Sequence, residues 1–152
     1  MLAVLSYYLI DHRDEVLREW LEAVQRNPDI LSSNHFSSEE LFDHLPKLLE
    51  NLAERLEHPQ FHYDSSAVSH PGRSHGKFCW RQGYTLAEVI REAGSIRWIL
   101  MRNWLDAFGQ EVPWLDEETR RTAEHIIHDA VEDLIADSAE QYLEEQEKSV
   151  SH

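Results

Sequence analysis

Apolar residues recur along most of the chain at intervals of three and four, the spacing of one face of an α-helix. The first stripe predicts one helix that ends before Asn27 and Pro28, because proline disfavours a helical residue before it. Its members are Leu5, Leu9, Val16, Leu17, Trp20, Leu21 and Val24.

A second stripe predicts a helix that starts after Ser37 and ends at Pro59. Ser37 and Glu40 form a capping box, in which the side chain of each residue bonds the backbone N–H of the other. Pro46 lies inside this stripe, so the helix either kinks there or restarts with Pro46 in its first turn. The stripe comprises Leu41, Leu45, Leu48, Leu49, Leu52 and Leu56.

Residues 59–72 are the least regular part of the sequence. A shorter third helix is predicted from Ser74 to Gln82, with a start near Ser65 as the alternative. Gly83 suits the cap that follows it, since glycine adopts the left-handed conformation found there.

The last two helices have the clearest start signals. Thr85 and Glu88 form another capping box, and the helix that follows ends between Gly109 and Pro113. Its predicted inward residues are Leu86, Val89, Ile90, Ala93, Ile96, Leu100 and Trp104. The final helix starts near Asp116 and buries Ala123, Ile127, Val131, Leu134, Ser138 and Tyr142.

These stripes need partners, so we expect an all-α fold, an antiparallel bundle of about five helices with a long C-terminal helix. A globin-like packing and a simple up-and-down bundle both fit these periods. We expect a domain over residues 1–144, and a polar tail or linker to a following domain over residues 145–152.

Charge narrows the classes of partner. The chain has 152 residues, with 14 Lys and Arg against 29 Asp and Glu, a net charge of −15. This argues against nucleic-acid binding and against docking on an anionic membrane. The single cysteine, Cys79, excludes an internal disulfide and suits a cytoplasmic protein.

The ten histidines raise the question of a metal. Pro59 stands between His58 and His62, so this pair does not lie on one continuous helix. The pair His125 and His128 is predicted at half-exposed positions beside the core. His75 with Cys79 is the best pair, because residues four apart share a helix face. Two ligands do not complete a site, so we expect no cofactor; the alternative is a helical module that binds haem or a transition metal through His75 and Cys79. We expect the five tryptophans in the core and at helix junctions.

Polar residues gather around the predicted corner at Gly83. One interpretation is a polar network of Arg81, Tyr84, Glu88 and Glu92, with Arg91 and Arg97 nearby. The alternative is a solvated helix face with ordinary ion pairs, each worth less than about 1 kcal/mol. No nucleophile, base and orienting group stand at a usable spacing, so we do not expect an enzyme.

The same stretch carries a resemblance to a known family. His75-Gly76, Gly83-Tyr84, Leu86, Glu88-Val89, Arg91-Glu92 and Ile96-Arg97 resemble the N-terminal domain of RsbT co-antagonist proteins of the RsbRD type. Cys79 stands where that family commonly has an arginine, and Ala93 where an aromatic residue is common.

The resemblance implies a non-catalytic sensory or regulatory input domain that precedes a bacterial histidine kinase or a STAS output domain. It implies a homodimer, since histidine kinases work as dimers. The expected regulatory residues are His75, Arg81, Tyr84, Glu88, Arg91, Glu92 and Arg97. The signal would pass along the C-terminal helix as a change in helix packing.

Overall fold

The computed structural model describes residues 2–30, 46–59 and 71–150, which form helices joined by turns, with no strand among them. The helices are α1 (Leu2–Asp11), α2 (Arg13–Arg26), α4 (Pro46–Glu57), α5 (Pro71–Arg81), α6 (Leu86–Trp98), η2 (Ile99–Leu105), α7 (Asp106–Glu111) and α8 (Glu117–Val150). The predicted all-α bundle with a long C-terminal helix is confirmed.

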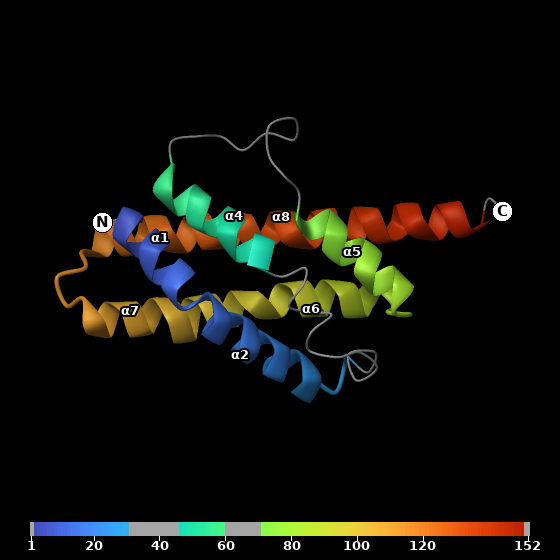
Figure 1. Ribbon diagram of the computed structural model, residues 1–152, viewed down its shortest axis with the longest axis horizontal. Helices are drawn as coiled ribbons and strands as arrows, with labels where there is room; N and C mark the ends of the chain where they lie inside the picture. Colours follow the sequence, from blue (N-terminus) through green and yellow to red (C-terminus); the bar gives the residue numbers. More distant parts are fainter. Residues whose placement is uncertain (1, 31–45, 60–70, 151–152) are drawn as a thin grey trace.

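Two long rods form the frame of the bundle. Helices α6, η2 and α7 follow one another without a break, and α8 returns antiparallel beside them (Figure 1). α5 packs along α8, α4 bridges α1 and α8, and α2 crosses the frame obliquely against α6 and η2.

The single helix predicted at the N-terminus is wrong, because the chain breaks at His12. That residue has φ −107° and ψ 13°, and its Nδ1 lies 2.9 Å from the carbonyl oxygen of Tyr8. The break lets α1 pack on α4 while α2 packs on α6 and η2. All seven predicted apolar positions of the two helices are nevertheless buried.

The middle helices differ from the prediction mainly at their starts. Pro46 stands in the first turn of α4, while Leu41, Leu45 and the Ser37–Glu40 capping box lie outside the described residues. α5 begins at Pro71 rather than Ser74, because a proline in the first turn needs no hydrogen-bond partner for its nitrogen.

The predicted corner after α5 is confirmed in detail. Gly83 has φ 81°, a left-handed conformation that favours glycine. Thr85 and Glu88 make both bonds of the capping box, at 3.2 Å from the Glu88 N–H to the Thr85 hydroxyl and 2.9 Å from the Thr85 N–H to the Glu88 carboxylate. The entry to α6 is therefore fixed by local sequence.

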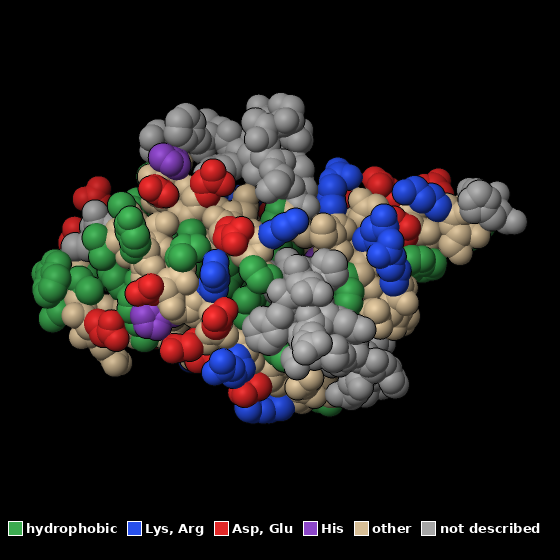
Figure 2. All heavy atoms as spheres, in the orientation of Figure 1, with side chains coloured by type: hydrophobic (Ala, Val, Ile, Leu, Met, Phe, Trp, Pro, Cys, Tyr) green, Lys and Arg blue, Asp and Glu red, His purple; other side chains and the backbone are tan. Residues whose placement is uncertain are grey.

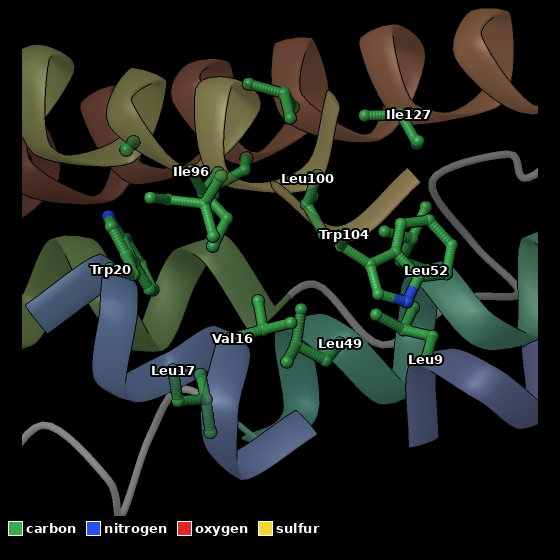
Figure 3. Close-up of a cluster of buried hydrophobic side chains, with 14 of the residues drawn as sticks. Leu9, Val16, Leu17, Trp20, Leu49, Leu52, Ile96, Leu100, Trp104 and Ile127 are labelled. Atoms are coloured by element: carbon green, nitrogen blue, oxygen red, sulfur yellow. The ribbon is translucent and has the colours of Figure 1, made fainter. Parts of the chain in front are cut away.

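A hydrophobic core fills the space between the frame and the shorter helices (Figure 3). The six predicted inward residues of α8 are all buried, but Ile90 of α6 is 41% exposed. The inward face of α6 is occupied instead by Val89, Glu92, Ala93 and Ile96.

The tryptophans divide between core and surface. Trp20 and Trp104 are buried and Trp80 is half-buried. Trp98 and Trp114 lie at helix junctions as predicted, but they are 61% and 70% exposed and so lack the predicted packing. Figure 2 shows exposed apolar side chains at the end of the molecule where α1 begins and α7 joins α8. Among the described helices, none combines the length and apolar character that crossing a membrane requires.

Candidate functional site

The structure divides the seven residues predicted at the corner into two groups. His75, Tyr84, Glu88 and Glu92 are buried between α5, α6 and α8. Arg81 and Arg91 are exposed and Arg97 is half-buried. Arg81 ends α5 on the surface, so it is not part of a network with the buried Tyr84 and Glu92.

Cys79 completes what we call the buried polar centre, the set His75, Cys79, Tyr84, Glu88 and Glu92. Sγ of Cys79 lies 3.6 Å from Nε2 of His75, and that nitrogen lies 3.9 Å from Oε1 of Glu92. All three side chains are at most 1% exposed. The sequence indicated the pair on α5, and only the packing of both α5 and α6 on α8 brings Glu92 to it.

Two glycines bring α5 close to α8. A Cβ atom on Gly76 would lie 2.2 Å from the carbonyl oxygen of Ser138, and one on Gly72 would lie 2.8 Å from Cβ of Asp137. Both distances are too short for a real contact. Glycine at these positions allows the backbones to approach, and it holds the His75 turn against the longest helix of the protein.

Trp20 of α2 closes the centre on another side. Its indole N–H donates to the backbone carbonyl of Glu92 at 3.0 Å and to the hydroxyl of Ser95 at 2.7 Å. The indole ring lies 5.9 Å from the ring of His75, measured between centroids. Trp20 therefore fixes the α6 backbone at Glu92. The sequence indicated a core residue here, with no sign of this contact.

Burial dominates the electrostatics of the centre. Removal from water raises the pKa of Glu92 to about 7; the neighbouring Tyr84 hydroxyl opposes this shift and the Glu88 carboxylate adds to it. Burial, with the charges of Glu92 and Glu88, also raises the pKa of the Cys79 thiol well above its usual value. The centre thus disfavours unpaired negative charge.

A tyrosine pair ties the centre to α8. The Tyr142 hydroxyl donates to the backbone carbonyl of Tyr84 at 2.6 Å, and the Tyr142 ring packs edge-on against Trp80. The Tyr84 N–H in turn bonds the carbonyl of Cys79 at 3.0 Å. Movement at the Gly83 corner is therefore connected to α8 by direct contacts.

A separate hollow lies between α4, α5 and α8. Apolar side chains such as Leu49, Leu52 and Leu100 line it together with Gly72. Arg55, also in its lining, pairs with Asp133 of α8 at 2.8 Å. None of the seven predicted residues lines this hollow, so it is distinct from the buried polar centre.

The other histidine pairs do not form such a cluster. His125 is 80% exposed in its side chain and His128 is exposed, so both lie farther from the core than the half-exposed positions predicted for them. His58 lies just beyond α4, and His62 is outside the described residues. Within the described part of the chain, one group of three or more metal-ligating side chains is compact enough to hold an ion: His75, Cys79 and Glu92.

Comparison with known proteins agrees with the resemblance carried by the corner. No curated protein and no solved structure matches the chain. A protein-family model, that of the RsbT co-antagonist protein RsbRD N-terminal domain, matches residues 14–152. Because this match covers nearly the whole chain, including the buried polar centre and all of α8, the protein belongs to the RsbRD N-terminal domain family.

Proposed function

We propose that this protein is a non-catalytic input domain of a bacterial signalling protein, and that it passes changes in helix packing through α8 to a histidine kinase or STAS output. Family membership supports a regulatory role of the stressosome type. The observation that carries the mechanism is the contact of α8 with the buried polar centre through Tyr142, and with the adjacent Gly76 of α5 through Ser138.

α8 is suited to transmit such a change. It runs for 34 residues, about 50 Å at 1.5 Å per residue. Its last buried residue is Tyr142, and the helix continues to Val150 beyond α5 and α6 (Figure 1). A ligand or partner that favours one packing of α5 on α8 would shift or rotate this projecting end. The expected tail at residues 145–152 is helical as far as Val150, so a linker there would be rigid.

We also propose that the domain acts as a homodimer in the cytoplasm. Leu143 and Val150 are exposed on the projecting end of α8 and are seven residues apart, the heptad spacing of a helix seam. The substitutions L143Q and V150Q together should convert a dimer to a monomer in sedimentation velocity. V4Q on α1, at a comparably exposed valine, is the control and should leave the dimer intact.

Helix phase tests the transmission route. Two alanines inserted between Glu144 and Glu145 of the full protein in its host rotate everything beyond them by about 200°. Seven inserted alanines lengthen the helix by about 10 Å and restore its face to within about 20°. The readout is the set of transcripts that changes when residues 1–140 are deleted.

The two-residue insertion should reproduce the transcript changes of the deletion, and the seven-residue insertion should stay close to the unaltered protein. If the two-residue insertion left all these transcripts unchanged, α8 would not be the route. If the deletion itself changed no transcript, the regulatory role would be wrong.

A further inference from the structure

We propose that His75, Cys79 and Glu92 bind a divalent transition-metal ion of the zinc type at the contact of α5 with α6. This inference goes beyond the input function and does not depend on it. It rests on the arrangement of the three donor atoms and on the surroundings of the Glu92 carboxylate.

The donor atoms stand close to the spacing that an ion requires. A tetrahedral zinc with bonds of about 2.0 Å to nitrogen and 2.3 Å to sulfur places those two ligands about 3.5 Å apart. Nε2 of His75 and Sγ of Cys79 are 3.6 Å apart. Oε1 of Glu92 is 3.9 Å from the same nitrogen, and the three donor atoms all lie within 4.8 Å of one another. A movement of the Glu92 carboxylate by about 1 Å would bring its oxygen within bonding reach and complete three ligands.

The surroundings of the Glu92 carboxylate are the second observation. The side chain is 0% exposed, its polar neighbours include the Tyr84 hydroxyl and the His75 ring, and neither carboxylate oxygen makes a hydrogen bond of standard geometry within the described part of the chain. Burying a carboxylate in such a place costs several kcal/mol unless a proton or a cation accompanies it. Arg81 and Arg91 do not fill this role, since both are exposed, and the His75 ring, with Nε2 3.9 Å from Oε1 of Glu92, is itself one of the three donors.

The donor set indicates which class of ion fits. One thiolate, one imidazole and one carboxylate suit zinc and related borderline ions rather than magnesium or calcium, which prefer oxygen ligands alone. Three protein ligands suffice, because zinc sites of this kind keep a fourth position for water. A haem is a poorer fit, since Nε2 of His75 faces Cys79 and Glu92 within 4 Å.

Binding of the ion would also neutralise the negative charges of the Cys79 thiolate and the Glu92 carboxylate. An ion of charge +2 would displace two protons, one from the Cys79 thiol and one from the protonated Glu92 carboxyl, so that thiolate, carboxylate and ion together are neutral. It would link α5 to α6 at the corner whose contacts with α8 are described above.

The test uses the whole chain and two metals. Zinc content is measured by mass spectrometry on protein purified without chelators, and the chelator-treated protein is titrated with Co²⁺. Cys79 is the single cysteine of the sequence, so a sulfur-to-cobalt charge-transfer band reports that residue alone. We expect one ion per chain and a saturable band.

Three substitutions at the centre, C79S, H75Q and E92Q, should each weaken Co²⁺ binding at least tenfold, and C79S should remove the band. H125Q and H128Q together are the matched control on exposed histidines and should change neither. Circular dichroism checks that each variant is folded. If a variant does not fold, the cobalt–sulfur band of the unaltered protein still tests whether Cys79 binds the ion.

Three results would overturn the inference. The first is a protein that takes up no stoichiometric Zn²⁺ or Co²⁺. The second is binding without the sulfur band, and the third is binding that E92Q and H75Q leave unchanged in folded protein, because in both cases the ion would occupy a different set of residues.

Discussion

The contact of Gly76 with α8 permits a quantitative test of how α5 is held. In Gly76→Ala, the added Cβ would lie 2.2 Å from the carbonyl oxygen of Ser138, whereas ordinary contacts begin near 3.4 Å. The neighbour is backbone in the middle of α8 and has no rotamer to change. The two helices must therefore separate locally by about 1 Å.

A gap of this size loses a quarter to a half of the dispersion energy across the contact. Overpacking of this kind costs about 3 kcal/mol, at the upper end of its usual range because backbone is struck. The better helix propensity of alanine returns about 1 kcal/mol. The net loss is about 2 kcal/mol, which lowers the melting temperature of a chain of this size by about 4–8 °C.

Gly94 on α6 is the matched control, because a Cβ there would meet only the Cδ1 of Ile135, at 3.7 Å. G94A should gain about 0.5–1 kcal/mol from helix propensity alone. G72A, with contacts of 2.8 and 3.0 Å, should be less destabilising than G76A.

The assay is urea and thermal unfolding of the three variants, followed by circular dichroism. The expected order of stability is G94A, unaltered protein, G72A, G76A. If G76A were as stable as G94A, α5 would not be packed on α8 as the structure has it, and the geometry of the buried polar centre would be wrong with it.

Three further predictions concern local bonds. Thr85→Ala removes half of the capping box and should cost about 1 kcal/mol in urea unfolding; an unchanged urea midpoint would show that the cap is not needed. Tyr142→Phe leaves the buried carbonyl of Tyr84 without its donor and should cost about 1–3 kcal/mol, whereas Tyr7→Phe on the surface should be neutral; equal effects of the two would contradict the buried bond. Hydrogen bonds with Thr119 at the start of α8 lower the pKa of Asp116 below its ordinary value of 3.8. The ionised carboxylate therefore stabilises the folded protein above pH 3.8, and this stabilisation is lost as the pH falls through the lower pKa of the folded state. Asp116→Ala should therefore melt below the unaltered protein at pH 6, with a gap that closes towards pH 3; a gap independent of pH would argue against the carboxylate as the cap.

Local signals in the sequence predicted the corner well. The Thr85–Glu88 capping box and the left-handed Gly83 depend on bonds between near neighbours, and both are present as predicted. The resemblance over residues 75–97 identified the family on the same stretch, and the family match extends it to residues 14–152. These features need no knowledge of how distant helices meet.

Side-chain direction was less predictable. Ile90 follows the apolar period of α6 and is exposed, while Glu92 breaks that period and is fully buried. The break at His12 follows from α1 and α2 packing on different partners. The π-helical turns of η2, which a sequence period of 3.6 does not show, lie in the middle of a rod and are a known feature of functional helices.

By itself, then, the sequence determined most of the helices and of their inward faces, the Thr85–Glu88 cap and the pair His75 and Cys79, because each depends on residues a few positions apart. Only the tertiary structure decided that Glu92 lies beside that pair and that Trp20 packs against it. It also decided that Arg81 and Arg91 stay on the surface. The reason is physical: which polar groups meet is set by the way α5 and α6 pack on α8, and the close approach of α5 to α8 depends on Gly72 and Gly76, whose contacts with a distant helix the sequence does not show.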